Sequence, residues 1–206
     1  MRTMDISLSK KQRTIFFEGD SLMNLSSAGV INDRYVTSTA YESIIAVKEK
    51  VAMSSYARND WQLIRDIIPV ISTNISPYIS ETDLIVIGAG SNDIASASKS
   101  GQQLFDALLS YRSEVIGRGV DIVVCTLIAR NYAGDKVDTM TEIAIYNQLV
   151  IDNASVYNYT VCDVAADSSF SDPNNSAFYS ADKLNLTTDG MNLYASYLSN
   201  TLIELL

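Results

Sequence analysis

The sequence predicts an α/β fold, a three-layer α/β/α sandwich built on a parallel five-stranded sheet of flavodoxin-like order. Two observations carry this prediction. Short runs of β-branched, aliphatic or aromatic residues alternate with longer segments of helical apolar spacing. The runs at 83–87 and 120–127 are largely apolar, which is typical of strands buried on both faces. Such an alternation favours parallel strands joined by helices that cover both faces of one sheet.

Five strands and five helices follow from this pattern. The predicted strands cover residues 13–18, 50–56, 83–87, 120–127 and 159–164. The predicted helices cover residues 41–47, 60–68, 102–118, 141–156 and 188–206. Pro69 is expected to close or kink the second helix, in which Trp61, Ile64, Ile67 and Ile68 would share a face. A long polar loop is expected at 168–185.

The whole chain, 1–206, is expected to form a single domain, because 47% hydrophobic content can fill one core and no linker interrupts the sequence. The net charge of −9 argues against nucleic acid or an anionic membrane as a partner. No apolar run reaches the length of a signal peptide or of a membrane span, about 18 residues. A soluble protein, cytoplasmic by default, is therefore expected, and the oligomeric state stays open.

The chain contains no histidine and only two cysteines. Mechanisms that need an imidazole are excluded, and so are the usual zinc sites. Cys125 and Cys162 lie in apolar runs, where cysteine usually behaves as a small core residue rather than as half of a disulfide.

Polar residues follow the first four predicted strands. These stretches are Gly19-Asp20-Ser21, Ala57-Arg58-Asn59, Gly88 to Asp93, and Ala129-Arg130-Asn131-Tyr132. Because the carboxyl ends of parallel strands meet at one rim, where ligands bind, we expect one cleft there. Asp20, Gly90 and Arg130 are expected to line it.

Two of these stretches resemble sequence blocks of the GDSL, or SGNH, serine hydrolases. Gly19-Asp20-Ser21-Leu22 resembles the first block, and Gly90-Ser91-Asn92-Asp93 resembles the Gly-x-Asn-Asp block. The resemblance implies the SGNH hydrolase fold, an acyl or acetyl ester as the substrate, and a covalent acyl intermediate on Ser21. It implies that neither a metal nor an organic cofactor is required. It also implies an oxyanion hole in which the Ser21 N–H and the Asn92 side chain donate hydrogen bonds, each typically worth ~3 kcal/mol of barrier.

Other interpretations of these blocks stay open. Asn92-Asp93 can instead cap the helix that follows. The family's remaining oxyanion donor, a glycine N–H, has its best match at Asn59, with Arg58 as the alternative and a helix cap at Asn59-Asp60 as the structural explanation. A dinucleotide turn at 88–93 is disfavoured, because Asp93 stands where the third glycine belongs and would repel a pyrophosphate.

The stretch from Asp182 to Gly190 resembles the family's Asp-x-x-His segment, with Asn185 in the place of the histidine. An Asn amide can donate to Asp182 and accept from the Ser21 hydroxyl, but it is far too weak a base to take the serine proton. The sequence therefore predicts a formed cleft with weak or absent hydrolysis.

Three explanations compete for Asn185. It is an inactivating or engineered change in an esterase, or the mark of a natural pseudoenzyme that binds a carbohydrate or a protein partner, or a change compensated by a poor carboxylate base such as Asp182 or Asp189. Several tyrosines in or near predicted loops could stack on a carbohydrate ester or be scattered surface residues. They are Tyr78, Tyr132, Tyr157, Tyr159 and Tyr179.

Overall fold

The computed structural model describes residues 13–23, 51–135 and 138–206. These residues form a five-stranded parallel sheet of order β2-β1-β3-β4-β5. The strands are β1 (Arg13–Gly19), β2 (Val51–Ser55), β3 (Leu84–Gly88), β4 (Asp121–Cys125) and β5 (Thr160–Cys162). The predicted parallel five-stranded sheet of flavodoxin-like order is thus confirmed, although β4 and β5 are shorter than their predicted runs.

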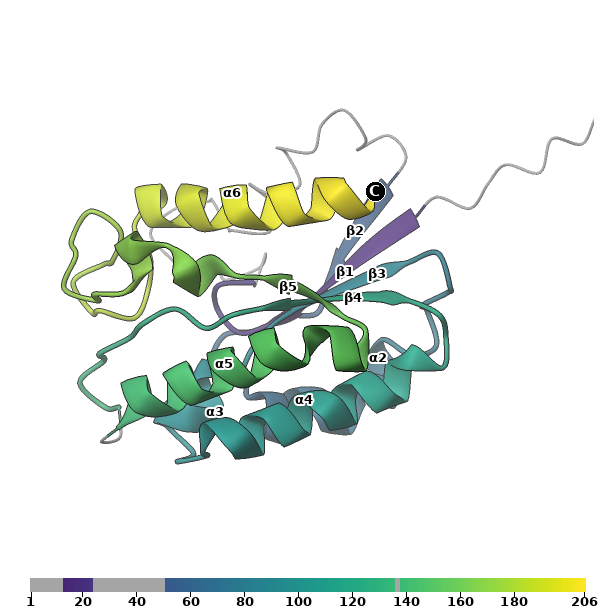
Figure 1. The fold of residues 1–206 in the computed structure, drawn as a ribbon, viewed down its shortest axis with the longest axis horizontal. Helices are drawn as coiled ribbons and strands as arrows, with labels where there is room; N and C mark the ends of the chain where they lie inside the picture. The colour runs from purple at the N-terminus through teal and green to yellow at the C-terminus, as the bar shows by residue number, and fades with distance from the viewer. Residues whose placement is uncertain (1–12, 24–50, 136–137) are drawn as a thin grey trace, which may run out of the picture.

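Helices cover both faces of this sheet, as Figure 1 shows. One face carries α6 (Thr188–Leu205), and the other carries α2 (Ile71–Asn74), α4 (Gly101–Ile116) and α5 (Thr139–Tyr157). A short helix, α3 (Ser91–Ala95), follows β3. Each face of the sheet has its own core: Ile15 and Phe17 of β1 pack toward α6, whereas Phe16 packs toward α4. The predicted helix at 41–47 lies outside the described residues.

The helical segment after β2 differs from the prediction. It begins at Leu63 with a π-helical turn (Leu63–Ile67), and it continues through Pro69 in a 3-10 turn (Ile68–Val70) into α2. Pro69 does not end it, because at the start of a turn the missing N–H of proline is not needed. The wider π turn also changes which side chains face inward. The fully buried set is Leu63, Ile67, Ile71 and Ile75, while Trp61, Ile64 and Ile68 are only partly buried.

The segment 168–185 is more ordered than a polar loop. It contains a 3-10 turn (Ser168–Phe170), and Tyr179 forms an antiparallel bridge with Leu186. Phe170 and Tyr179 are buried against Tyr194 of α6, with the Phe170 ring 6.3 Å from that of Tyr179 and 6.2 Å from that of Tyr194. This apolar anchor fixes the segment that leads into α6.

Cys125 and Cys162 face each other in the register of β4 and β5, and both are buried free thiols. Their predicted role as core residues is confirmed. None of the helices within residues 13–23, 51–135 and 138–206 combines the length and the apolar character needed to span a membrane.

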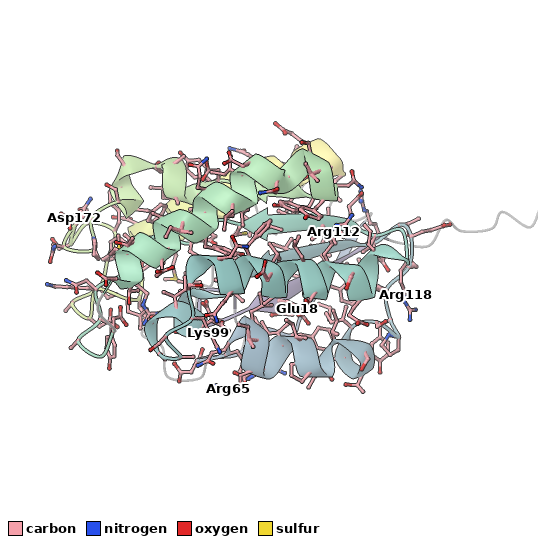
Figure 2. All side chains as sticks on the ribbon, turned by 60° about the horizontal axis from the view of Figure 1, so that its bottom comes forward. Glu18, Arg65, Lys99, Arg112, Arg118 and Asp172 are labelled. Carbon is pink, nitrogen blue, oxygen red and sulfur yellow. The ribbon has the colours of Figure 1, made fainter. Side chains whose placement is uncertain are left out.

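Several carboxylates are buried among the described residues, and Glu18 is one that lacks a full set of hydrogen-bond partners. Glu18 of β1 is 2% exposed, and its Oε2 atom has no hydrogen-bond partner among the described residues. Figure 2 shows Glu18 inside the molecule, whereas Arg65 and Arg118 lie at its periphery. Burial raises the pKa of Glu18 to about 8, so the side chain is largely protonated at neutral pH.

Candidate active site

A cleft lies at the carboxyl ends of β1, β3 and β4. Four residues predicted for the site line it together: Asp20, Ser21, Asn92 and Arg130. Its other walls come from Leu22, Gly88, Ser91, Thr126, Leu127, Ile128, Ala129, Leu184 and Tyr194. The rim formed by the strand ends therefore gathers residues that are distant in sequence, as the parallel fold requires.

Ser21 stands on a tight turn directly after β1. The turn starts at Gly19, where a Cβ would come within 2.4 Å of the Gly88 carbonyl oxygen, so β1 and β3 approach closely only because this residue is glycine. Asp20 then closes the turn: its Oδ1 accepts from the Leu22 N–H at 3.1 Å, and its carbonyl accepts from the Met23 N–H at 3.2 Å. This geometry leaves the Ser21 side chain partly exposed in the cleft.

The Asp20 carboxylate is nearly inaccessible, with 3% of the residue exposed. Its Oδ2 accepts from the Ser91 hydroxyl at 3.2 Å. Burial raises the pKa of Asp20 to about 6, and the hydrogen bonds from Leu22 and Ser91 limit the rise. Asp20 thus links the β1 turn to the loop after β3.

Gly90 opens that loop with φ of +130°, a conformation that residues with a side chain rarely adopt. A Cβ here would lie 2.5 Å from a methyl group of Leu104. Gly90 therefore shapes the turn that presents Ser91 and Asn92 to the cleft, but the structure does not place it in the lining, where the sequence predicted it.

Asn92 and Asp93 have separate roles. The Asn92 Nδ2 donates to the Trp61 carbonyl at 3.2 Å, and its Oδ1 accepts from Arg130 Nη1 at 2.9 Å. Asp93 is buried and accepts from the N–H groups of Leu63 at 2.7 Å and Ile64 at 3.0 Å. Asp93 therefore caps the helical segment after β2, not the helix that follows it, while burial raises the pKa of its carboxyl.

Arg130 is 4% exposed and lies at the centre of a polar network. Its Nε and Nη2 donate to the two carboxylate oxygens of Asp135 at 2.9 and 2.8 Å. Its Nη1 donates to Ser91 Oγ at 3.1 Å as well as to Asn92. The sequence analysis missed Ser91 and Asp135, yet a buried arginine after a strand requires a nearby carboxylate, and Asp135 is an acidic residue close to it in sequence.

Asp182 and Asn185 form the pair that the last block predicts. The Asn185 Nδ2 donates to Asp182 Oδ2 at 2.7 Å, and the N–H groups of Leu184 and Asn185 donate to Oδ1 at 3.0 and 2.9 Å. Burial raises the pKa of Asp182, but these hydrogen bonds outweigh it, and the pKa lies below its ordinary value. The N–H of Asn131 donates to the Lys183 carbonyl at 3.0 Å, which ties this loop to the one after β4. Leu184, rather than Asn185, lines the cleft.

Asn59, the sequence match to the family's remaining oxyanion donor, does not line the cleft. Asn59 is exposed and is absent from the lining, and the residue with positive φ is Asp60, at +59°. The alternative, Arg58, uses its N–H to donate to the Gly19 carbonyl at 3.1 Å. Its guanidinium lies over the Trp61 ring, 5.7 Å from the centroid.

Two tyrosines suggested for sugar stacking are core residues. Tyr159 is 8% exposed and donates to the Val150 carbonyl, and Tyr179 is 2% exposed and donates to the Phe170 carbonyl. Tyr132, beside Arg130 in sequence, is 46% exposed. Within the described part of the chain, no three cysteine, aspartate or glutamate side chains are grouped to hold a metal ion.

The sequence matches no model of a known protein family and no curated protein. The structure is similar to several solved structures. A member of the lipolytic G-D-S-L family from Veillonella parvula has 17% identity and a TM-score of 0.73, over 91% of this chain and 97% of that one. A lipase/acylhydrolase from Enterococcus faecalis has 16% identity and a TM-score of 0.69, over 92% and 95%. The acetyl xylan esterase AlAXEase has 14% identity and a TM-score of 0.70, over 92% and 99%. The chain therefore has the three-layer fold of the GDSL, or SGNH, hydrolases.

Proposed function

We propose that the protein is a GDSL-type serine esterase scaffold with Ser21 as its nucleophile, and that the chain as it stands hydrolyses acyl esters weakly or not at all. The observation that carries this proposal is the 2.7 Å hydrogen bond from Asn185 Nδ2 to Asp182 Oδ2. In a serine triad an imidazole N–H makes the corresponding bond to the acid. In the proposed triad, Asp182 would supply the orienting acid, whereas Asn185 would supply no base.

The reaction would begin with attack of Ser21 Oγ on the ester carbonyl carbon. The carbonyl oxygen gains negative charge, which the Ser21 N–H and the Asn92 amide would stabilise. The serine proton must leave at the same time, and the alcohol must receive a proton before it departs. An amide at position 185 can do neither, and loss of the base from a serine triad costs about 10⁶-fold in turnover.

The cleft suits an ester with a small acyl group. Leu22, Leu127, Ile128 and Leu184 give it apolar walls, and Ser91 and Asn92 add polar groups to the lining. The similarity to an acetyl xylan esterase supports acetyl esters of carbohydrates as the first substrates to test.

A non-catalytic binding protein is the second candidate. It is favoured by the exposed ring of Tyr132, in the segment that follows Arg130, because an exposed aromatic side chain near a cleft can stack on a sugar ring. In that case Asn185 is the native residue of a carbohydrate-binding or partner-binding pseudoenzyme.

Hydrolysis of 4-nitrophenyl acetate and of an acetylated xylo-oligosaccharide tests the first candidate. The unchanged chain is compared with Asn185→His, Asn185→Gln and Asn185→His/Ser21→Ala. We expect Asn185→His to raise kcat by about 10³-fold or more, Asn185→Gln to leave the activity unchanged, and Ser21→Ala to abolish the gain.

Two outcomes would contradict the proposal. Strong activity of the unchanged chain that disappears with Ser21→Ala would show that the missing base does not matter. A folded Asn185→His variant without any gain would favour the binding protein, and calorimetric titration with the same oligosaccharide would then measure its affinity.

A further inference from the structure

We propose that Arg130 is a positioning residue, which fixes the orientation of the Asn92 amide so that one of its N–H bonds is available to the cleft. The role assigned to that N–H rests on the proposed function, whereas the orientation itself does not. Asp135 in turn fixes the Arg130 guanidinium through two hydrogen bonds.

The orientation of Asn92 follows from what its two neighbours can do. A guanidinium only donates hydrogen bonds, so the Asn92 atom 2.9 Å from Arg130 Nη1 must be the amide oxygen. A carbonyl only accepts them, so the atom 3.2 Å from the Trp61 oxygen must be the amide nitrogen. A flip of the amide would break both bonds. With one N–H engaged by Trp61, the other remains for a ligand in the cleft that Asn92 lines.

Arg130 can act in this way because it is itself immobilised. Its two hydrogen bonds to Asp135 form a planar, bidentate pair, and the side chains are only 4% and 8% exposed. Such a pair fixes the plane of the guanidinium and hence the direction of Nη1. A lysine would supply the charge without this plane.

Arg130 is poorly suited to bind an anionic substrate directly. Four hydrogen bonds, two to Asp135 and one each to Ser91 and Asn92, occupy four of its five N–H donors. The positive charge is balanced by Asp135 at 2.8 Å. Its influence on a ligand therefore passes through the groups that it orients.

The second group is the Ser91 hydroxyl. Because its oxygen accepts from Arg130, its proton is directed to Asp20 Oδ2, 3.2 Å away. Arg130 thus orders a chain of polar groups that ends at the residue before the nucleophile. The positive charge of Arg130 also opposes the rise in the pKa of Asp20 that burial causes.

The first test uses the chain with Asn185 in place and does not depend on hydrolysis. Loss of Arg130 alone would leave the buried Asp135 carboxylate without a balancing positive charge. The variant is therefore Arg130→Met/Asp135→Asn, which keeps an acceptor for the Tyr132 N–H. Proton exchange of the Asn92 side-chain amide is measured by ¹⁵N NMR. We expect it to become about tenfold faster or more in this variant.

The pair Arg65→Met/Asp66→Asn serves as the control, because these side chains are 60% and 21% exposed and none of their hydrogen bonds goes to Ser91 or Asn92. The Asp66→Asn change keeps an acceptor for the Gln62 N–H. Proton exchange of the Asn92 side-chain amide should be unchanged in this control variant. Equal Asn92 exchange in the unchanged chain and in the Arg130→Met/Asp135→Asn variant would overturn the inference.

The second test is a double-mutant cycle in the Asn185→His background. Asn92→Ala should lower kcat by about 10²-fold to 10³-fold, the usual loss for one oxyanion donor. Arg130→Met/Asp135→Asn should lower kcat by about tenfold or more with little change in KM, and adding it to Asn92→Ala should cost no further activity. Arg130→Lys should not restore kcat, since the planar donor is missing.

Additive losses in this cycle would show that Arg130 acts independently of Asn92 and would overturn the positioning role. If Asn185→His is inactive, the proposed function fails, and amide exchange alone decides the orientation of Asn92. The two failures are therefore distinguishable.

Discussion

Asn185 Nδ2 lies 2.7 Å from Asp182 Oδ2, while two backbone N–H groups hold the other carboxylate oxygen. Asp182 is thus an oriented, ionised acid whose pKa stays below its ordinary value although burial opposes this. Such an acid is suited to hold an imidazole ring in the correct tautomer. In the proposed triad, Asp182 would keep this orienting role if a histidine stood at position 185.

This relationship predicts the effect of Asp182→Asn once a histidine is present. In the Asn185→His variant, Asp182→Asn should lower kcat by about 10⁴-fold with a small effect on KM, because the wrong imidazole tautomer is then favoured. Steady-state hydrolysis of an activated acetyl ester measures the loss. An unchanged kcat would place the histidine outside the reach of Asp182.

Glu18→Gln should raise the free energy of unfolding, and the gain should grow as the pH rises from 4.5 to about 8. The folded-state pKa of Glu18, about 8, lies above its ordinary value of 4.5, so the folded state binds the proton more tightly than the unfolded state. Stability contributed by this group is full below pH 4.5 and is lost as the pH rises to about 8. At about 1.4 kcal/mol per pKa unit, the gain from Glu18→Gln above pH 8 is on the order of 5 kcal/mol.

Urea unfolding at pH 5, 7 and 8.5 measures this gain. The difference in unfolding free energy between Glu18→Gln and the unchanged chain should grow with pH. A difference that is independent of pH would mean that Glu18 ionises normally in the fold.

Asp93→Asn should destabilise the protein. An amide keeps one acceptor oxygen and turns an NH₂ group toward the N–H of Leu63 or Ile64. One buried N–H then loses its partner, at a cost of about 1–3 kcal/mol. Thermal unfolding gives the change, and Asp106→Asn on the exposed side of α4 is the control that should have almost no effect. Equal thermal unfolding midpoints for Asp93→Asn and Asp106→Asn would contradict the role of Asp93 as a helix cap.

Gly190→Ala should destabilise the loop that carries Asp182 and Asn185. A Cβ at this position would lie 2.2 Å from the Phe178 carbonyl oxygen, which the backbone can avoid only by shifting. We expect a loss of about 1–3 kcal/mol in urea unfolding. Gly117→Ala, where a Cβ meets nothing within 4 Å and φ is −63°, should be neutral or slightly stabilising. Comparable losses in both variants would rule out the contact with Phe178 as the cause.

The sheet could be predicted from the sequence because its signals are local. The runs around Phe17, Val86 and Val123 are apolar enough to be strands in any context, and their alternation with helices leaves few topologies. The sequence could not predict which residues of the helical segment after β2 face the core. A π turn places Leu63 and Ile67 there instead of the residues that a regular helix would bury. Periodicity assumes a regular helix, and nothing in the sequence marks the wider turn.

The site was predictable where a residue occupies a rim position by topology. Ser21, Asn92 and Arg130 follow three different strands, and they reach one cleft for that reason. Asn59 also follows a strand, but the chain turns there so that its side chain meets solvent. The partnership of Arg130 with Asp135 depends on loop geometry that strand order does not determine.

The reaction rate of the buried thiols of Cys125 and Cys162 can be used to measure opening of the sheet. Both are sealed inside the core that α6 covers, so a thiol reagent can reach them only after β4, β5 or α6 separates from its neighbours. The labelling rate at low reagent concentration then reports the equilibrium population of that open form, and at high concentration its rate of opening. Because both thiols belong to the sequence itself, at positions 125 and 162, no cysteine has to be introduced to measure how often the end of β4, which precedes Arg130, separates from the sheet.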